Sequence, residues 1–473
     1  MKLLLRSLLV LLAGLSIEVH AQVLLSDSLL VTYTIEELIA EGIADPENPI
    51  EVHRLRYATT DPFGQPTMAS GAVVLPIAPG CHHAMAAYMH GTILDREDVP
   101  SRLSSEIIVG YFLGASGYVG VLPDYLGLGD GPGRHPYIHA ASEATASIDM
   151  LRATREFCAL RNVQLNGQLF LVGYSQGGHA CMATHKMIEE QFAEEFQVTA
   201  SAPCSGPYDA SGVQAAVITD TIPYPAPYYL PYVLFSYQYV YPWLFDTVNE
   251  VLQEPWATVL PPLFLGNNGS GVVDDVMPVV PSEILQDSVL QAFRTNPEHP
   301  FRIALRENDL YNWAPIAPVR MLYCEGDGHV FYQNSIVALD TMVSLGSTTV
   351  SAQNIGSALD HSDCAFPALL SAKGWFDSLQ WPCEFIGMVE RAGTAWSLFP
   401  NPAQDLLHIQ VSNGHDGMEQ WTMLHADGRA ITSGRMYISS GSAKIDLPEA
   451  PPGVYVLLLG DQGGITALRF VLE

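Results

Sequence analysis

The chain has 473 residues, of which 48% are apolar, so it is long enough for one large and one small domain, or two of middle size. It carries 50 acidic residues against 21 Lys and Arg, a formal net charge of −29. Such a surface repels phosphate, which excludes nucleic acid as a partner and disfavours tight docking on anionic membranes. The acidic residues are spread along the chain, which indicates a solvated surface.

The first 21 residues have the pattern of a secretory signal peptide. Lys2 and Arg6 precede a short apolar run over Leu8–Ile17, and the small residue Ala21 offers a cleavage site before Gln22. The run is shorter than the roughly 20 apolar residues of a membrane-spanning helix, although a retained anchor is the alternative. We therefore expect export, and a secreted or cell-surface protein.

From residue 22 to about 387, short apolar runs alternate with helical patterns. Residues 51–75 predict a hairpin, interrupted by Asp61-Pro62-Phe63-Gly64. The strands expected next are Ala84–Met89, Gly117–Pro123, Leu169–Val172, Val319–Cys324 and Thr348–Ile355. The expected helices are Ser142–Leu160, Gly178–Phe192, Tyr332–Leu345 and one near Ala368–Gln380. This alternation predicts an α/β fold, with a mostly parallel sheet flanked by helices on both faces.

The alternation of strands and helices stops over residues 209–308, a stretch rich in Tyr, Pro and Trp. It indicates an insertion at the edge of the sheet. The functional interpretation is a cap that lines an apolar substrate pocket. The alternative is a helical insert that only packs on the body of the domain.

A different pattern follows a linker near residues 388–395. Short alternating strands separated by Gly, Asn and Asp turns predict a small β-sandwich over residues 396–473. The strands expected there are Leu406–Val411, Gln420–His425, Ala443–Leu447, Val454–Leu459 and Ile465–Leu472.

Seven cysteines bear on the redox state and on metals. They are Cys81, Cys158, Cys181, Cys204, Cys324, Cys364 and Cys383. Export would allow some of them to pair, the odd number leaves one over in a monomer, and spacing does not assign the bridges. The sequence has no C-x-x-C pair, and Cys81-His82-His83 is better read as a structural or surface segment than as a metal site. We expect no metal and no cofactor.

The segment Gly173-Tyr174-Ser175-Gln176-Gly177-Gly178 lies between an expected strand and an expected helix. A G-x-S-x-G motif in that context places the serine on a sharp turn with its hydroxyl exposed above the sheet. Its neighbours must be small, and the following helix directs its N-terminus at the site. Ser175 is therefore the candidate nucleophile.

The other members of a catalytic triad follow from chain order, which in such a fold is serine, acid, histidine. Asp327 follows the strand Val319–Cys324 and is the candidate acid, with Glu325 and Asp309 as fallbacks.

Of the histidines after this acid, His361 is the candidate base. His329 is too near Asp327 in sequence to complete the triad, and the remaining ones, His408, His415 and His425, belong to the β module. A neutral His361 would take the Ser175 proton while Asp327 fixes its tautomer.

An oxyanion hole requires two backbone N–H donors. Gln176, directly after the nucleophile, is expected to supply one. Thr92, which follows a strand in His90-Gly91-Thr92, is expected to supply the other. Tyr125 also follows a strand, and we expect it to line the pocket.

Four segments together resemble the secretory lipase-like branch of the α/β-hydrolases, over about residues 52–382. They are Tyr88-Met89-His90-Gly91-Thr92, Leu122-Pro123-Asp124-Tyr125-Leu126-Gly127-Leu128-Gly129, the Ser175 segment, and Gly326-Asp327-Gly328-His329-Val330. The resemblance implies esterase or lipase activity with Ser175, Asp327 and His361 as the triad. Members of this branch often carry a cap insert.

The tail is similar to the C-terminal sorting domain of the bacterial type IX secretion system. The matching residues are Leu398-Phe399-Pro400-Asn401-Pro402-Ala403, Gly428-Arg429 and Pro452-Gly453-Val454-Tyr455. The similarity implies that the type IX machinery is a partner and that export proceeds through the periplasm. The alternative is an accessory β-sandwich that binds a ligand.

These features favour a secreted carboxylic ester hydrolase, with a small-molecule or lipid ester as substrate and an acyl-enzyme on Ser175. A serine peptidase of the same fold is the first alternative, and a non-catalytic surface-binding protein is the second. The apolar insert favours an acyl chain.

Overall fold

The computed structural model describes residues 22–383, 396–411, 416–425, 430–461 and 464–472. The chain forms two compact units, Met1–Glu384 and Phe385–Glu473. The expected signal peptide and the linker near residues 388–395 lie outside the described residues.

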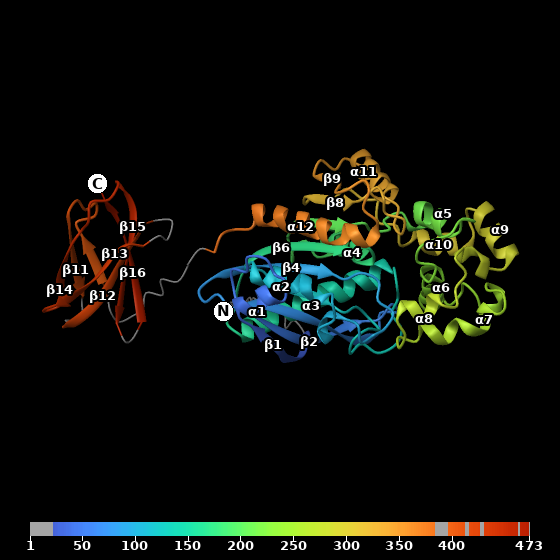
Figure 1. The fold of residues 1–473 in the computed structure, drawn as a ribbon, viewed down its shortest axis with the longest axis horizontal. Coiled ribbons are helices and arrows are strands. Elements are labelled where there is room, and N and C mark those ends of the chain that lie inside the picture. Colours follow the sequence, from blue (N-terminus) through green and yellow to red (C-terminus); the bar gives the residue numbers. More distant parts are fainter. Residues whose placement is uncertain (1–21, 384–395, 412–415, 426–429, 462–463, 473) are drawn as a thin grey trace, which may run out of the picture. The chain divides into compact units, whose positions relative to one another are not determined.

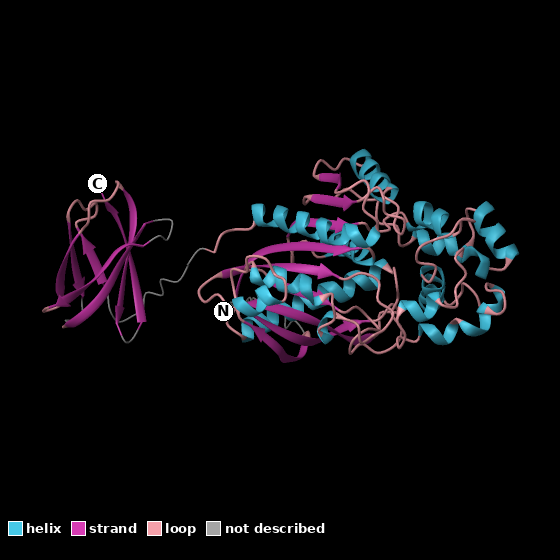
Figure 2. Ribbon diagram, in the orientation of Figure 1, coloured by secondary structure: helices cyan, strands magenta, loops and turns pink. Residues whose placement is uncertain are grey.

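The first unit is built on a nine-stranded sheet of order β1-β2-β3-β5-β4-β6-β7-β8-β9 (Figures 1 and 2). Its strands are β1 (Leu24–Tyr33), β2 (Ile50–Thr60), β3 (Pro66–Pro76), β4 (His82–Met89), β5 (Val119–Pro123), β6 (Gln164–Tyr174), β7 (Val198–Cys204), β8 (Val319–Tyr323) and β9 (Val350–Asn354). Six neighbouring strands of the sheet are parallel: β5, β4, β6, β7, β8 and β9. Strands β1, β2 and β3 extend the sheet in antiparallel fashion. The expected α/β fold is confirmed.

Two layers of helices cover the sheet, because strands buried on both faces need apolar partners on each side. Along β4, alternate residues face opposite layers: Ala86 packs with α2 and α12, and Ala87 packs with α3 and α4. The covering helices are α2 (Ile107–Ala115), α3 (Ala140–Leu160), α4 (Gln176–Gln191), α11 (Gln333–Ser344) and α12 (His361–Leu379), and a short α1 (Ile35–Ala40) follows β1.

Residues 209–308 form the helical insertion, which Figure 1 shows as a separate cluster at one end of the sheet. We call it the cap. Its helices are η2 (Ala210–Gln214), α5 (Ala215–Ile218), α6 (Tyr229–Val240), η3 (Val248–Glu250), α7 (Trp256–Val259), η4 (Pro261–Phe264), α8 (Ser270–Asp274), η5 (Pro281–Ile284), α9 (Asp287–Thr295) and α10 (Pro300–Arg306). The apolar core of the cap also includes Leu94, Tyr137 and Ile138 of the body.

The second unit has two antiparallel sheets, of order β10-β11-β14 and β13-β12-β15-β16, around a shared apolar core. Its strands are β10 (Trp396–Phe399), β11 (Leu406–Val411), β12 (Gly417–His425), β13 (Ala430–Ile438), β14 (Ser442–Asp446), β15 (Gly453–Asp461) and β16 (Gly464–Leu472).

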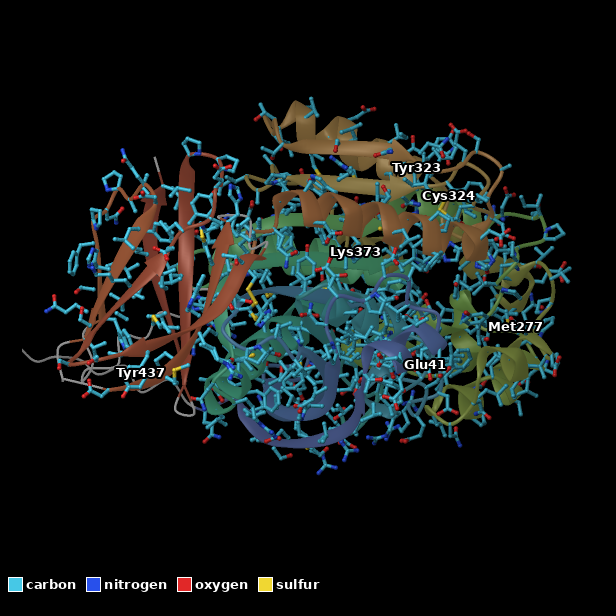
Figure 3. The ribbon with its side chains drawn as sticks, turned by 60° about the vertical axis from the view of Figure 1, so that its left-hand side comes forward. Glu41, Met277, Tyr323, Cys324, Lys373 and Tyr437 are labelled. Carbon is cyan, nitrogen blue, oxygen red and sulfur yellow. A yellow bond between two sulfur atoms is a disulfide. The ribbon has the colours of Figure 1, made fainter. Side chains whose placement is uncertain are left out.

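Two disulfides join cysteines whose pairing the sequence left open, Cys81–Cys383 and Cys324–Cys364. Figure 3 labels Cys324 at the end of β8 and Lys373 on α12, the helix that carries Cys364. Cys158, Cys181 and Cys204 are buried free thiols. Within the described part of the chain, no helix is long and apolar enough to cross a bilayer.

Candidate active site

Ser175 occupies the turn between β6 and α4. Its backbone has φ +61° and ψ −121°, a strained conformation for a residue with a side chain. A Cβ at Gly177 would collide with the carbonyl oxygen of Met89, and one at Gly173 would collide with the backbone of Gly177. The turn is therefore possible only with glycine on both sides of the serine.

The structure brings together three of the expected site residues, all nearly buried. His361 Nε2 lies 2.9 Å from Ser175 Oγ, and His361 Nδ1 lies 2.7 Å from Asp327 Oδ2. Because the carboxylate can only accept, Nδ1 carries a proton and Nε2 is free to accept one from the serine. The arrangement fits a nucleophile with its general base.

The loop that follows β8 fixes the position of the Asp327 carboxylate. The backbone N–H groups of His329 and Val330 both donate to Asp327 Oδ1, each at 2.9 Å. The carboxylate thus receives two N–H groups on one oxygen and the imidazole on the other. The fallback acid Asp309 lies elsewhere, where Ser211 donates to both of its oxygens, and its burial raises its pKa to about 6.

His361 is the first residue of α12, and Asp360 caps the helix by accepting from the Asp363 N–H. The expectation that this helix begins near Ala368 was wrong by about two turns. Pro367 resembles a helix start, because proline is favoured in the first turn, but it lies inside the helix. The cap at Asp360 sets the earlier start and fixes the backbone of the imidazole.

Gln176, the first expected oxyanion donor, is the first residue of α4, where backbone N–H groups have no acceptor within the helix. Gly91 lies against the same turn, because a Cβ there would be 3.9 Å from the Cβ of Ser175. Thr92 follows it, and its Oγ1 lies 2.9 Å from the hydroxyl of Tyr137. Both expected donor segments therefore border Ser175.

Tyr125 does not line the pocket, contrary to expectation. Its side chain is 1% exposed within the sheet core, and its hydroxyl donates to the carbonyl of His90 at 3.2 Å. Burial raises its pKa well above the usual value. A tyrosine just after a strand is compatible with either position, so the sequence could not distinguish the two.

Three aromatic residues lie near the triad: His329, which the sequence analysis considered only as a rejected base, and Tyr137 and Tyr229, which it did not single out. The ring of His329 is stacked on that of His361, with centroids 4.7 Å apart and 8° between the planes. Tyr137 and Tyr229 line the pocket above Ser175. Burial raises the pKa of Tyr229, and hydrogen bonding to Tyr228, Thr92 and Ser175 partly opposes that rise. Tyr229 lies about 50 residues from Ser175 in sequence, so no local pattern could have placed it there.

An apolar pocket rises from Ser175 into the cap. Its walls come from Pro207 and Val330 on the body and from cap helices α5, α6, α9 and α10. The cap residues that line it include Ile218, Leu230, Val233, Leu234, Val289, Phe293 and Phe301. Of the residues that the structure describes, no Asp, Glu, Lys or Arg lines this pocket, so it suits an uncharged apolar group.

The described residues contain no cluster of three or more His, Cys, Asp or Glu side chains suited to a metal ion. His83 Nδ1 instead contacts the carbonyl of Gly117 at 2.8 Å, and Cys81 is in a disulfide.

Comparison with known proteins places this site in a family. A secretory lipase model matches residues 101–222, which include Ser175. The chain is 30% identical to the rice cell wall degrading esterase LipA from Xanthomonas oryzae, with a TM-score of 0.69, and the match covers 76% of this chain and all of that one. The chain belongs to the secretory lipase family.

Two further solved structures share the fold. A putative hydrolase from Legionella pneumophila is 28% identical, with a TM-score of 0.69 and coverage of 76% of this chain and 98% of that one. Candida antarctica lipase A in its closed state, at 15% identity and a TM-score of 0.58, shares the fold over 77% of this chain and 84% of that one. No curated protein sequence matches significantly.

The tail belongs to a second family, because residues 397–473 match the secretion system C-terminal sorting domain. This secretory lipase is therefore a hydrolase of the lipase and esterase type, and it is secreted or displayed at the cell surface. The expected fold family and localisation are confirmed.

Proposed function

We propose that this secretory lipase hydrolyses carboxylic esters of apolar acids through an acyl-enzyme on Ser175. The observation that carries the proposal is the 2.9 Å contact between Ser175 Oγ and His361 Nε2 at the base of an apolar pocket. The esterase relatives support the reaction class.

In the proposed mechanism, His361 takes the proton of Ser175 as its oxygen attacks the ester carbonyl. The developing oxyanion is bound by the N–H groups of Gln176 and Thr92, and α4 directs its positive end at it. His361 then gives the proton to the leaving alcohol. A water molecule then attacks the acyl-enzyme carbonyl while His361 takes its proton. His361 returns the proton to Ser175 Oγ as the acid is released.

The test compares wild-type protein with Ser175→Ala on p-nitrophenyl butyrate and palmitate. We expect the variant to lose at least a thousandfold in kcat, because the nucleophile is gone. Ser335→Ala, a buried serine of α11, is the matched control and should keep its activity. Ester turnover that survives Ser175→Ala would refute the mechanism, and turnover of peptide anilides but not esters would favour a peptidase.

We further propose that residues 1–21 are a signal peptide and that the tail is read by the type IX machinery. Val23 and Leu24, just after the expected cleavage site, donate their backbone N–H groups to Glu156 at 2.9 and 2.8 Å. A mature chain that begins at Gln22 would keep both contacts. N-terminal sequencing of exported protein should begin at Gln22, and a start beyond Leu24 would contradict the cleavage site.

A further inference from the structure

A buried carboxylate lies behind the nucleophile and has no role in the mechanism above. Glu143, in the first turn of α3, is 1% exposed. Its Oε1 accepts from Gln176 Nε2 at 2.9 Å, and its Oε2 lies 2.7 Å from His179 Nδ1. Burying a charge costs free energy unless it is paired and hydrogen-bonded, so these two partners account for its presence.

His179 is the cationic partner of this carboxylate. Its Nε2 lies 2.9 Å from the carbonyl oxygen of Asn308, and its Nδ1 faces Glu143. Both neighbours can only accept, so the ring donates at both nitrogens and is protonated. Burial lowers the pKa of His179, but Glu143, Asn308 and Asp309 together raise it above the usual value. His179 in turn lowers the pKa of Glu143 against the effect of burial.

The side chain of Gln176 is held by both of its amide hydrogens. His135 Nδ1 donates to the carbonyl of Leu126 at 2.9 Å, which leaves His135 Nε2 as an acceptor 2.7 Å from Gln176 Nε2. The second amide hydrogen goes to Glu143. Reversing the amide would place its oxygen against the carboxylate, so Glu143 fixes its orientation.

This arrangement of Gln176 destabilises the folded state, which argues that it is kept for a function in the active site. Gln176 Oε1 is buried and has no hydrogen-bond partner among the residues that the structure describes. A buried acceptor that is left without a partner destabilises the folded state, because it has lost its hydrogen bonds to water. Gln176 also borders the substrate pocket, and its backbone N–H is the proposed oxyanion donor directly after Ser175.

We propose that Glu143 is a positioning residue for the oxyanion hole: its carboxylate, held by His179, fixes Gln176 so that the Gln176 backbone N–H stays aimed at the oxyanion. This inference rests on the proposed function. The network also reaches the end of the cap, because Asn308 Oδ1 accepts from the N–H of Ala140 at the start of α3. Helices α3 and α4 and the end of the cap thus meet behind the donor.

The test is Glu143→Gln, measured on p-nitrophenyl butyrate and with an alkyl boronic acid that forms a tetrahedral adduct with the serine. Removing one oxyanion donor costs about 10²–10³ in kcat, so a misplaced donor should cost about 10- to 100-fold. We expect KM to change less than about threefold and boronate affinity to fall in parallel with kcat, because only the tetrahedral species uses the donor.

Glu189→Gln is the matched control, because Glu189 also pairs with a buried histidine of α4, His185, at 3.0 Å, and lies outside the site. It should leave kcat and boronate affinity unchanged. Gln176→Met, which keeps the Glu143–His179 pair, should reproduce the loss and decides the matter if Glu143→Gln fails to fold.

Wild-type kcat and boronate affinity in a folded Glu143→Gln variant would overturn the inference. The same result in Gln176→Met, if Glu143→Gln does not fold, or an equal loss in Glu189→Gln, would also overturn it. Ester turnover that survives Ser175→Ala in the same assay would instead overturn the proposed function, so the two failures are distinguishable.

Discussion

At the scale of single residues, the stacked rings of His329 and His361 are a further contact that orients the proposed base. His361 is held at Nδ1 by Asp327, at its backbone by Tyr174, whose hydroxyl donates to the His361 carbonyl at 2.5 Å, and on one face by His329. Burial lowers the pKa of His329 to about 4, so the ring is neutral near pH 7 and does not repel an imidazolium at His361.

We therefore predict that His329→Ala lowers kcat for ester hydrolysis by about 2- to 12-fold, the equivalent of about 0.5–1.5 kcal/mol for an aromatic pair. His329→Phe keeps a flat ring and should recover most of the loss. Steady-state kinetics of both variants check this. Equal activity of the Ala and Phe variants would show that stacking contributes nothing.

Sequence reasoning reached Ser175, Asp327 and His361, because a local motif and a fixed chain order constrain them, and the structure places these three within hydrogen-bonding distance. It did not reach Glu143 or Tyr229. Their proximity to the serine depends on how α3 and the cap pack against the body. Hydrophobic periodicity in the sequence does not predict such tertiary contacts.

At the scale of elements, the disulfide Cys324–Cys364 joins the end of β8 to the first turn of α12. Cys324 precedes Asp327 by three residues and Cys364 follows His361 by three. Both cysteines are fully buried. The bridge therefore fixes the spacing between the two elements that carry the acid and the base.

Replacing both of these cysteines by alanine should lower the free energy of unfolding by about 2–4 kcal/mol and should also lower kcat. The same change at Cys81 and Cys383 should lower stability without affecting kcat, because that bridge lies away from the site. Thermal unfolding and ester kinetics on both double variants check this. A kcat unaffected in the first variant would contradict the role of the bridge.

The cap makes a separate prediction. Val289 of α9 lines the pocket, so Val289→Trp should narrow it. Because pocket contacts are worth about 10- to 200-fold per methylene, we expect kcat/KM on palmitate to fall at least tenfold while butyrate is unaffected. Val272→Trp, at an exposed position of α8 outside the lining, should change neither. Equal losses on both esters would argue against an acyl pocket.

Several elements escaped the sequence analysis for physical reasons. β7 (Val198–Cys204) reads Val-Thr-Ala-Ser-Ala-Pro-Cys, and its small residues give little apolar signal although the strand is central. α2 is almost wholly apolar, so no helical period stands out. β6, α3 and β11 have strong patterns, and their positions were predicted to within a few residues at most ends.

At the scale of the whole molecule, buried histidines make stability depend on pH. Burial lowers the pKa of His135, His139 and His329 to about 4, against 6.5 in the unfolded chain. Between these pH values the three histidines bind protons in the unfolded chain but not in the folded one. The free energy of unfolding therefore falls as pH falls from about 6.5 towards 4. Asp309, with its pKa raised to about 6, and His179, whose pKa is also raised, act in the opposite direction and offset part of this effect.

We predict that the folded state is less stable near pH 5 than near pH 7, with His135 alone contributing on the order of 2 kcal/mol. Denaturant unfolding at high salt, which screens the repulsion of the acidic surface, checks this. His135→Gln should show a weaker pH dependence. A stability that is flat or rises towards pH 5 would contradict the assignment.

The central claim is that Ser175 is the nucleophile, and covalent trapping tests it most directly. A p-nitrophenyl alkylphosphonate, which mimics the tetrahedral intermediate, should release one equivalent of p-nitrophenol and abolish ester turnover. Peptide mass spectrometry should then place the phosphonyl group on Ser175. Labelling on another residue, or full turnover after Ser175 is labelled, would contradict the account.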